Sequence, residues 1–216
     1  MINAVVFDLD GVLIDSEPVW ERVRRQVVAD HGGHWLPEAQ GRLMGMSTQE
    51  WASYLSDDLG VGLPPERVAA MVIDEMAASY SDHLPLMPGA AGAVRRMADR
   101  WPLGLGSSAP VRLIDIVLSA AGLRDSFAVT MSTEQVPHGK PAPDIYLAVT
   151  ARLGFPPSQC AAVEDSTNGL RSAAAAGLAV VAVPHPRYPP DPAALAQAKL
   201  VLTGLDELTV TAILDP

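Results

Sequence analysis

Four polar segments of the chain carry residue types that could together do chemistry on a phosphate ester. They are Asp8-Leu9-Asp10-Gly11-Val12, Gly106-Ser107-Ser108, Gly139-Lys140-Pro141 and Glu164-Asp165-Ser166. They supply a candidate nucleophile, a hydroxyl group, a cation and a second acidic cluster. These are the groups that Mg²⁺-assisted phosphoryl transfer requires.

Carboxylates are expected at the centre of this chemistry. Asp8 could attack phosphorus and divide a difficult hydrolysis into two easier steps. The two anions repel each other, so a divalent cation is needed, and Mg²⁺ is usually held by one or two carboxylates plus the substrate phosphate. We expect Asp8 and Asp165 to hold it. Asp10 could protonate the leaving alkoxide and then take a proton from the attacking water.

The remaining phosphate oxygens need donors. We expect Lys140 and the Ser107 hydroxyl to supply them, together with backbone N–H groups around Ser108. Taken alone, a lysine is most often a solvated surface charge and two serines often form a turn, but their places beside predicted strand ends favour phosphate contact. Asn168 could support the site or only occupy the first turn of a helix that Ser166 caps.

Apolar runs that could form buried parallel strands alternate with helical segments along most of the chain. The runs are residues 4–7, 103–106, 127–131, 161–163 and 179–183, with a short run at 200–202. Helical periodicity covers residues 110–121, 143–153 and 167–176, and each segment stops at a glycine. This alternation predicts an α/β fold with a doubly wound parallel sheet. The polar segments would then meet at the carboxyl edge of the sheet, where such folds bind ligands.

The alternation is interrupted between Ser16 and Leu84, where only helical stripes occur. This segment is too long for a loop in a compact domain. We therefore expect an inserted all-α domain of residues 16–84 and a core domain of residues 1–15 and 85–216. Two crossing points between the domains are compatible with a hinge.

Several side chains of the insertion are open to more than one interpretation. Trp20 lies on an apolar stripe, so a packing or hinge role suits the pattern as well as a substrate contact does. Met44 and Met46 flank Gly45 and could make adaptable apolar contacts to a substrate. Arg22, Arg24 and Arg25 are expected on solvated helix faces. Outside the insertion, the proline-rich segment 184–192 is expected to be a surface excursion.

Composition limits the classes of partner. The chain has 216 residues, a net charge of −10 and a hydrophobic fraction of 49%, which indicate a folded acidic protein with no nucleic-acid or anionic-membrane partner. No apolar run approaches the length of a membrane span, and no signal peptide is evident. A single cysteine, Cys160, lies in a strand-like run and is expected to be a small buried residue in a reducing cytoplasm. We expect a small phosphorylated metabolite as ligand, and a monomer or weak homodimer.

Taken together, the four motifs resemble those of the haloacid dehalogenase superfamily of phosphohydrolases. Their order, spacing and strand context agree with it, and the likeness covers essentially the whole chain, including Pro141-Ala142-Pro143-Asp144 after Lys140. The resemblance implies that the helical insertion is the first type of cap in this superfamily. It also implies Asp8 as nucleophile, Asp10 as general acid and base, and Ser107 and Lys140 as phosphate ligands. Mg²⁺ would be bound by Asp8, the Asp10 carbonyl and Asp165, with Glu164 beside them.

Branches of the superfamily can be partly separated. Dehalogenating members lack the second aspartate of the first motif, so Asp10 disfavours dehalogenation. The chain is similar to the β-phosphoglucomutase-like group, but mutases of that group carry a histidine and a cap arginine where this chain has Trp20 and Thr48. We therefore expect a phosphatase similar to 2-deoxyglucose-6-phosphatase, acting on a sugar phosphate. A phosphosugar mutase is the alternative, and a non-catalytic sensor of a phosphorylated ligand is an alternative of another class.

Overall fold

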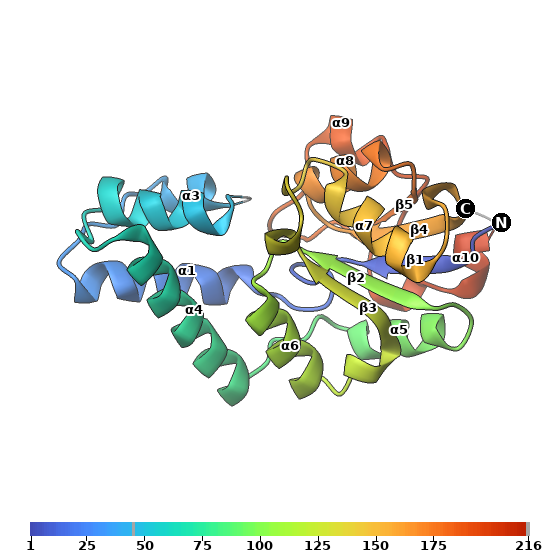
Figure 1. Cartoon of the computed structure of the whole chain (residues 1–216), viewed down its shortest axis with the longest axis horizontal. Coiled ribbons are helices and arrows are strands. Elements are labelled where there is room, and N and C mark those ends of the chain that lie inside the picture. Colours follow the sequence, from blue (N-terminus) through green and yellow to red (C-terminus); the bar gives the residue numbers. More distant parts are fainter. Residues whose placement is uncertain (45, 215–216) are drawn as a thin grey trace. The chain divides into compact units, whose positions relative to one another are not determined.

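Six strands form one parallel sheet in the order β3-β2-β1-β4-β5-β6 (Figure 1). The computed structural model describes residues 1–44 and 46–214; Gly45, near which a substrate contact was expected, lies outside the described residues. The strands are β1 (Ala4–Phe7), β2 (Leu103–Ser107), β3 (Phe127–Ser132), β4 (Cys160–Glu164), β5 (Ala179–Ala182) and β6 (Leu200–Val201). Each predicted strand is present to within one residue at either end. The predicted doubly wound α/β class is confirmed.

Helices cover both faces of this sheet, as expected for parallel strands joined by right-handed crossovers. Helices α7 (Asp144–Leu153) and α8 (Thr167–Ala175) pack on one face, and α5 (Ala90–Ala98) and α6 (Val111–Ala120) lie on the other (Figure 1). Two short helices complete the core unit, α9 (Pro192–Leu195) and α10 (Val210–Leu214). The sheet is therefore buried on both sides, and its carboxyl edge is left for the polar segments.

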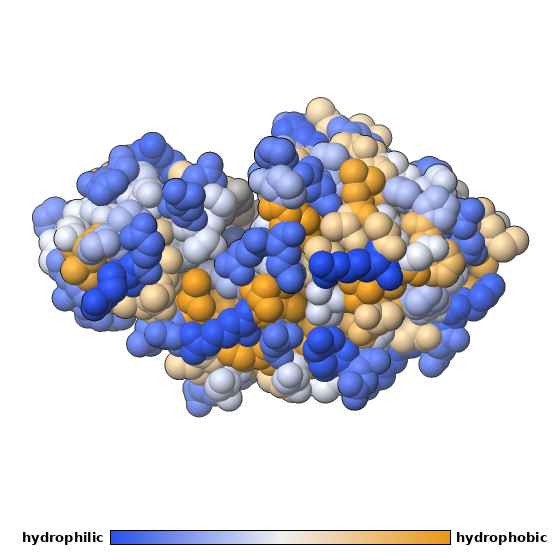
Figure 2. Space-filling model, in the orientation of Figure 1, coloured by the Kyte–Doolittle hydropathy of each residue, from blue (hydrophilic) through white to orange (hydrophobic). Residues whose placement is uncertain are grey.

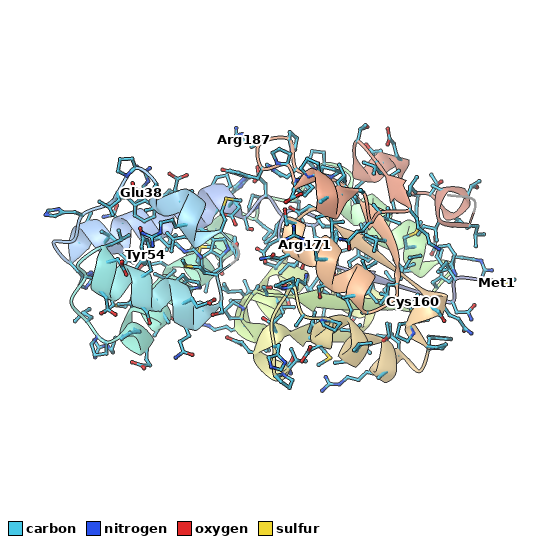
Figure 3. The ribbon with its side chains drawn as sticks, turned by 90° about the horizontal axis from the view of Figure 1, so that it is seen from above. Met1, Glu38, Tyr54, Cys160, Arg171 and Arg187 are labelled. Atoms are coloured by element: carbon cyan, nitrogen blue, oxygen red, sulfur yellow. The ribbon has the colours of Figure 1, made fainter. Side chains whose placement is uncertain are left out.

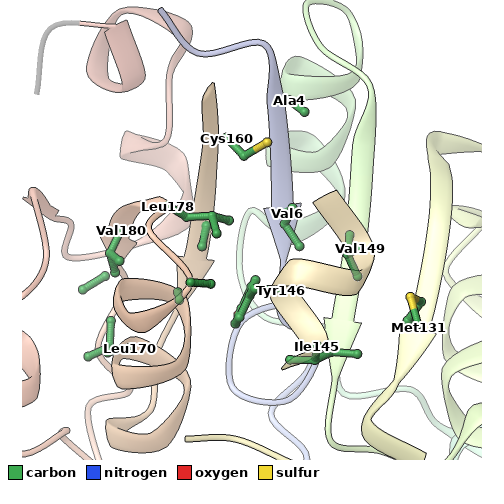
Figure 4. Packing of buried hydrophobic residues seen from close by; sticks show 14 of the residues in the cluster. Ala4, Val6, Met131, Ile145, Tyr146, Val149, Cys160, Leu170, Leu178 and Val180 are labelled. Carbon is green, nitrogen blue, oxygen red and sulfur yellow. The ribbon is translucent and has the colours of Figure 1, made fainter. Parts of the chain in front are cut away.

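Glycines in β2 allow helix α7 to lie close to the sheet. A Cβ atom on Gly104 would overlap Val149 of α7, and one on Gly106 would lie 3.2 Å from Ile145. Figure 4 shows Ile145, Tyr146 and Val149 of this helix directed at the sheet. All three are fully buried. This close packing fixes the position of the segment that precedes α7, which carries Lys140.

The chain divides into two compact units, one of Met1–Asp15 with Pro85–Pro216 and one of Ser16–Leu84. The second unit has no strand among its described residues. Its helices are α1 (Glu17–Asp30), α2 (Ala39–Leu43), α3 (Thr48–Ser53), a π-helical turn η1 (Tyr54–Asp58) and α4 (Pro65–Asp82). Helix α4 packs on both α1 and α3, and the apolar stripes meet there through buried residues such as Val27 and Val72.

One arginine of the helical unit does not lie where the sequence predicted. Arg24 was expected on a solvated face, but it is buried. Its guanidinium group lies 4.6 Å from the ring centre of Trp20 and 5.2 Å from that of Trp51. Stacking on two aromatic faces stabilises a buried guanidinium group. Arg22 and Arg25 are exposed.

The proline-rich segment 184–192 lies at the surface, as expected, with most of its residues exposed. His185 is buried, stacks on Tyr188 with ring centres 5.2 Å apart, and places Nε2 3.4 Å from Asp15 Oδ1. Asp191 caps helix α9 and accepts a hydrogen bond from Arg171 of α8, a residue labelled in Figure 3. These contacts hold both ends of the excursion against the core unit.

No helix among the described residues combines the length and apolar character that crossing a membrane requires. Figure 2 shows hydrophilic residues across the visible face of each unit, interspersed with smaller groups of apolar residues. Cys160 is a buried free thiol in β4, as predicted.

Candidate active site

The polar segments gather at the carboxyl ends of three neighbouring strands. Strand β1 pairs with β4 on one side and with β2 on the other, in parallel register. Asp8 directly follows β1, Asp165 directly follows β4, and Ser107 ends β2. The backbone N–H of Asp8 donates to the carbonyl of Val163 across the β1–β4 pair, at 3.0 Å. The sheet itself therefore sets the spacing between the two aspartates.

The loop after β1 turns tightly beneath the second acidic segment. The N–H of Gly11 donates to the carbonyl of Ile14 at 2.8 Å, and Gly11 has a φ of 76°, in the left-handed region that favours glycine. A Cβ atom at this position would overlap the Asp165 carboxylate. Gly11 is thus required both by the turn and by the close approach of Asp165 to the loop.

Lys140 lies between two carboxylates. Its Nζ is 2.9 Å from Asp8 Oδ1 and 2.7 Å from Glu164 Oε1, and its side chain is only 4% exposed. The same Nζ lies 5.2 Å from the ring centre of Tyr146. A buried lysine paired with two anions remains charged, and these anions raise its pKa although burial alone would lower it. Lys140 is a structural part of the site and not a solvated surface charge.

Glu164 is fully buried and receives four hydrogen-bond donors. Its Oε1 accepts from Lys140 Nζ and from the hydroxyl of Tyr146. Its Oε2 accepts from the backbone N–H of Asp165 at 3.2 Å and from the hydroxyl of Ser166 at 3.3 Å. Both oxygens of this buried carboxylate therefore have hydrogen-bond donors, as burial of a polar group requires.

The N-terminus of helix α8 closes around this carboxylate. The Ser166 hydroxyl accepts a hydrogen bond from the N–H of Gly169 at 3.1 Å and caps the helix, as predicted. A Cβ atom on Gly169, in the first turn, would overlap the Glu164 carboxylate, so this position favours glycine. Asn168 lies in the first turn of the same helix and is half-buried. The partial positive charge of the helix N-terminus favours an anion at this position.

Ser107 and Asp10 face each other across the β1–β2 pair. The Ser107 hydroxyl lies 3.4 Å from Asp10 Oδ2, within reach of a weak hydrogen bond, and it accepts from the N–H of Ala109 at 3.0 Å. Ser107 is fully buried and Ser108 is exposed. The structure therefore brings Ser107 to the carboxylates, and it leaves Ser108 beside them at the surface.

Sequence reasoning missed Ser132 at the end of β3. Ser132 is opposite Ser107 in the strand register, is fully buried, and donates its hydroxyl to the carbonyl of Ala109 at 2.7 Å. It thereby holds the turn that follows Ser107. Its position at the end of a predicted strand, level with a candidate site residue, was the signal that could have identified it.

Three carboxylates could hold a metal ion. The oxygens of Asp8, Glu164 and Asp165 lie within 4.8 Å of one another. Burial raises the pKa of Asp8 to about 7 and that of Asp165 well above its usual range, and neighbouring carboxylates add to both shifts while Lys140 opposes them. Oδ1 of Asp165 has no hydrogen-bond partner among the described residues. Excess negative charge and an unpartnered carboxylate oxygen fit a hard divalent cation.

The side chains of two expected site residues, Asp10 and Trp20, contact other groups than the carboxylate cluster. The carboxylate of Asp10 is directed at Ser107, so a metal contact by Asp10 would come from its backbone carbonyl, as the resemblance implied. Trp20 belongs to the helical unit, where it is buried and packs against Trp51 with ring centres 6.0 Å apart. Those contacts are typical of a core residue.

Comparison with known proteins places this site in a family. The family model of the haloacid dehalogenase-like hydrolases matches residues 2–177, and the chain belongs to that family. It is 36% identical to hexitol phosphatase B of Escherichia coli (strain K12) over 219 residues, which covers 99% of this chain and 97% of that protein. It is 33% identical to the phosphorylated carbohydrates phosphatase of Thermotoga maritima, over 82% of each chain. The expected family is confirmed, and the chain is a phosphoric monoester hydrolase of that family.

Solved structures give the same fold. CbbY of Rhodobacter sphaeroides in complex with phosphate superimposes with a TM-score of 0.85, at 28% identity and with 96% of each chain covered. The β-phosphoglucomutase of Clostridium difficile gives a TM-score of 0.83 over 100% of this chain and 96% of that one, but at 22% identity. The second likeness shows the fold alone.

Proposed function

We propose that this protein is a Mg²⁺-dependent phosphatase that hydrolyses a small sugar phosphate through a phosphoaspartyl intermediate on Asp8. The observation that carries the proposal is the arrangement around Asp8. Its carboxylate follows a buried strand, lies 2.9 Å from the Lys140 ammonium, and shares a cluster with Asp165. A nucleophile needs this combination of a fixed position and nearby positive charge.

The metal site is assigned to Asp8 and Asp165, with the Asp10 carbonyl as a further ligand. Mg²⁺ bound there would reduce the repulsion between the nucleophile and the phosphate. Glu164, the fourth expected metal residue, is given a supporting role because its oxygens already receive four donors. It holds Lys140 and the start of α8 in place.

Phosphate binding is assigned to Lys140, Ser107 and the backbone around Ser108. Lys140 offers a charged donor beside Asp8, and the Ser107 hydroxyl lies at the adjacent strand end. Donors held by a folded scaffold stabilise charge on the phosphate oxygens without having to reorganise during the reaction. Asn168 is placed as a supporting residue in the first turn of α8.

Asp10 is assigned the proton transfers. It lies two residues beyond the nucleophile and within 3.4 Å of the Ser107 hydroxyl. In the first step Asp8 displaces the substrate alkoxide while Asp10 gives it a proton. In the second step Asp10 takes a proton from water as the water attacks phosphorus and releases Asp8.

The substrate class is assigned from the names of two relatives, and the helical unit is assigned the role of enclosing the substrate. Hexitol phosphatase B and the phosphorylated carbohydrates phosphatase are named for sugar or sugar-alcohol phosphates. We place the substrate of this chain in the same class. The helical unit of residues 16–84 would act as a cap that excludes water and contacts the sugar.

Phosphate release from a panel of sugar and small metabolite phosphates tests the proposal. Wild type and Asp8→Asn are compared with and without Mg²⁺, and β-glucose 1-phosphate is also monitored for conversion to glucose 6-phosphate. Release that requires both Mg²⁺ and Asp8 supports a phosphatase. Isomerisation without net release would identify the mutase alternative. Binding of sugar phosphates without turnover would identify the sensor alternative.

A further inference from the structure

Tyr146 carries a polar group into an otherwise apolar cluster. It lies on the sheet-facing side of α7, is fully buried, and packs among residues such as Val6 and Val149 (Figure 4). A phenylalanine would satisfy this packing equally well. The hydroxyl is therefore the feature that packing does not explain, and buried tyrosine hydroxyls normally have a specific partner.

The partner of this hydroxyl is the carboxylate that also holds Lys140. Glu164 Oε1 accepts from the Tyr146 hydroxyl and, at 2.7 Å, from Lys140 Nζ. Burial and the neighbouring carboxylates raise the pKa of Tyr146 well above its usual range. The phenol therefore stays protonated and acts only as a donor.

Because Glu164 Oε1 accepts from both Tyr146 and Lys140, the tyrosine changes how strongly the carboxylate attracts the lysine. Lys140 Nζ contacts Glu164 on one side and Asp8 on the other. The Tyr146 hydroxyl offsets part of the charge on Oε1, so the carboxylate attracts the ammonium less strongly than it would alone. More of the positive charge of Lys140 is then directed toward Asp8 and a bound phosphate.

We propose that Tyr146 is a positioning residue that acts through Glu164 to keep Lys140 directed at Asp8 and the phosphate. The inference rests on the proposed function, because that function makes Lys140 a phosphate ligand. Tyr146 itself does not touch the substrate. Its hydroxyl, and not its ring, carries the effect.

Tyr146→Phe tests this role because it keeps the ring and removes only the hydroxyl. The readout is the dissociation constant for inorganic phosphate in the presence of Mg²⁺, measured by calorimetry. We expect it to rise about tenfold, the scale that corresponds to the loss of one hydrogen bond to a charged group. Tyr54→Phe is the matched control, because Tyr54 is a buried tyrosine of the helical unit whose hydroxyl has no hydrogen-bond partner among the described residues. Phosphate affinity should be unchanged in that control.

A double-mutant cycle shows whether Tyr146 acts through Glu164. In the Glu164→Gln background, adding Tyr146→Phe should change phosphate affinity by less than about twofold, because the shared carboxylate is gone. A further tenfold loss in that background would overturn the inference. Unchanged phosphate affinity in Tyr146→Phe would also overturn it. A loss of phosphate affinity accompanied by equal losses of Mg²⁺ affinity and of melting temperature would overturn it too, because it would indicate a role in folding only.

This readout separates the two proposals. If the wild type binds phosphate but releases none from any ester, the proposed function fails while the role of Tyr146 is still measured. If the wild type hydrolyses esters and Tyr146→Phe binds phosphate normally, only the inference about Tyr146 fails. Failure of the wild type to bind phosphate at all would overturn the inference about Tyr146, and the proposed function would then be decided by ester hydrolysis alone.

Discussion

Lys140 Nζ lies 2.9 Å from Asp8 Oδ1, at the point where β1 ends. The ammonium and the carboxylate are both almost fully buried, so their attraction is only weakly screened by solvent. A lysine that also contacts Glu164 brings one positive charge to a cluster of three carboxylates. The remaining negative charge is what a bound cation would balance.

Asp10→Asn should affect poor leaving groups most. A sugar alkoxide must be protonated as it leaves, whereas p-nitrophenolate leaves readily without a proton. We expect the turnover number to fall by about a hundredfold or more with a sugar phosphate, and by clearly less with p-nitrophenyl phosphate. Equal losses on the two substrates would show that Asp10 is not the acid.

Lys140→Met should destabilise the metal-free protein. Removing the cation leaves Asp8 and Glu164 buried without their charge partner, which typically costs about 3–5 kcal/mol. Lys199→Met is the matched control because Lys199 is the other lysine of the chain and is exposed, so a change within about 0.5 kcal/mol is expected there. Urea unfolding with chelator present measures both. Similar losses in the two variants would contradict the assigned role of Lys140.

Gly169→Ala and Gly41→Ala should have opposite effects. Both glycines are helical, but a Cβ on Gly169 would overlap the Glu164 carboxylate, whereas Gly41 has nothing within 4 Å of the added atom. We expect the first substitution to cost about 2 kcal/mol and to reduce phosphate release. The second should stabilise the protein by about 0.5–1 kcal/mol. Thermal unfolding and phosphate release are measured on both, and a harmless Gly169→Ala would contradict the close fit at α8.

Mg²⁺ should raise the melting temperature through the carboxylate cluster. A ligand that binds only the folded state adds about 2.7 kcal/mol of stability at a hundred times its dissociation constant. Asp165→Asn should lose most of the shift because it removes an assigned ligand. Asp125→Asn, at an exposed position in the turn after α6, should retain it. Equal shifts in both variants would place the ion elsewhere.

Most of the fold and the main site residues could be predicted from the sequence because they depend on local patterns. The central strands are apolar on both faces, and the polar motifs directly follow strand ends, where the topology brings them together. Neighbouring strand ends then suffice to put Asp8, Ser107 and Asp165 side by side. Element order and the geometry of parallel sheets are enough to define this placement.

The parts that could not be predicted depend on contacts between distant residues. The local sequence predicts a solvated position for Arg24. Its burial depends on Trp51, which lies on another helix and supplies the second aromatic face. His185 and Asp15 are far apart in sequence, and nothing local indicates that they meet. Tyr146 lies on the apolar stripe of α7, which accounts for its buried ring, but periodicity carries no information about where its hydroxyl points.

Chemical trapping of the intermediate tests the central claim most directly. The enzyme is quenched in acid during turnover of a sugar phosphate with Mg²⁺, treated with borohydride, and digested for peptide mass spectrometry. An acyl phosphate is reduced by this treatment, so we predict conversion of Asp8 to homoserine in the turnover sample only. Unmodified Asp8 during rapid phosphate release, or modification at another carboxylate, would contradict nucleophilic attack by Asp8.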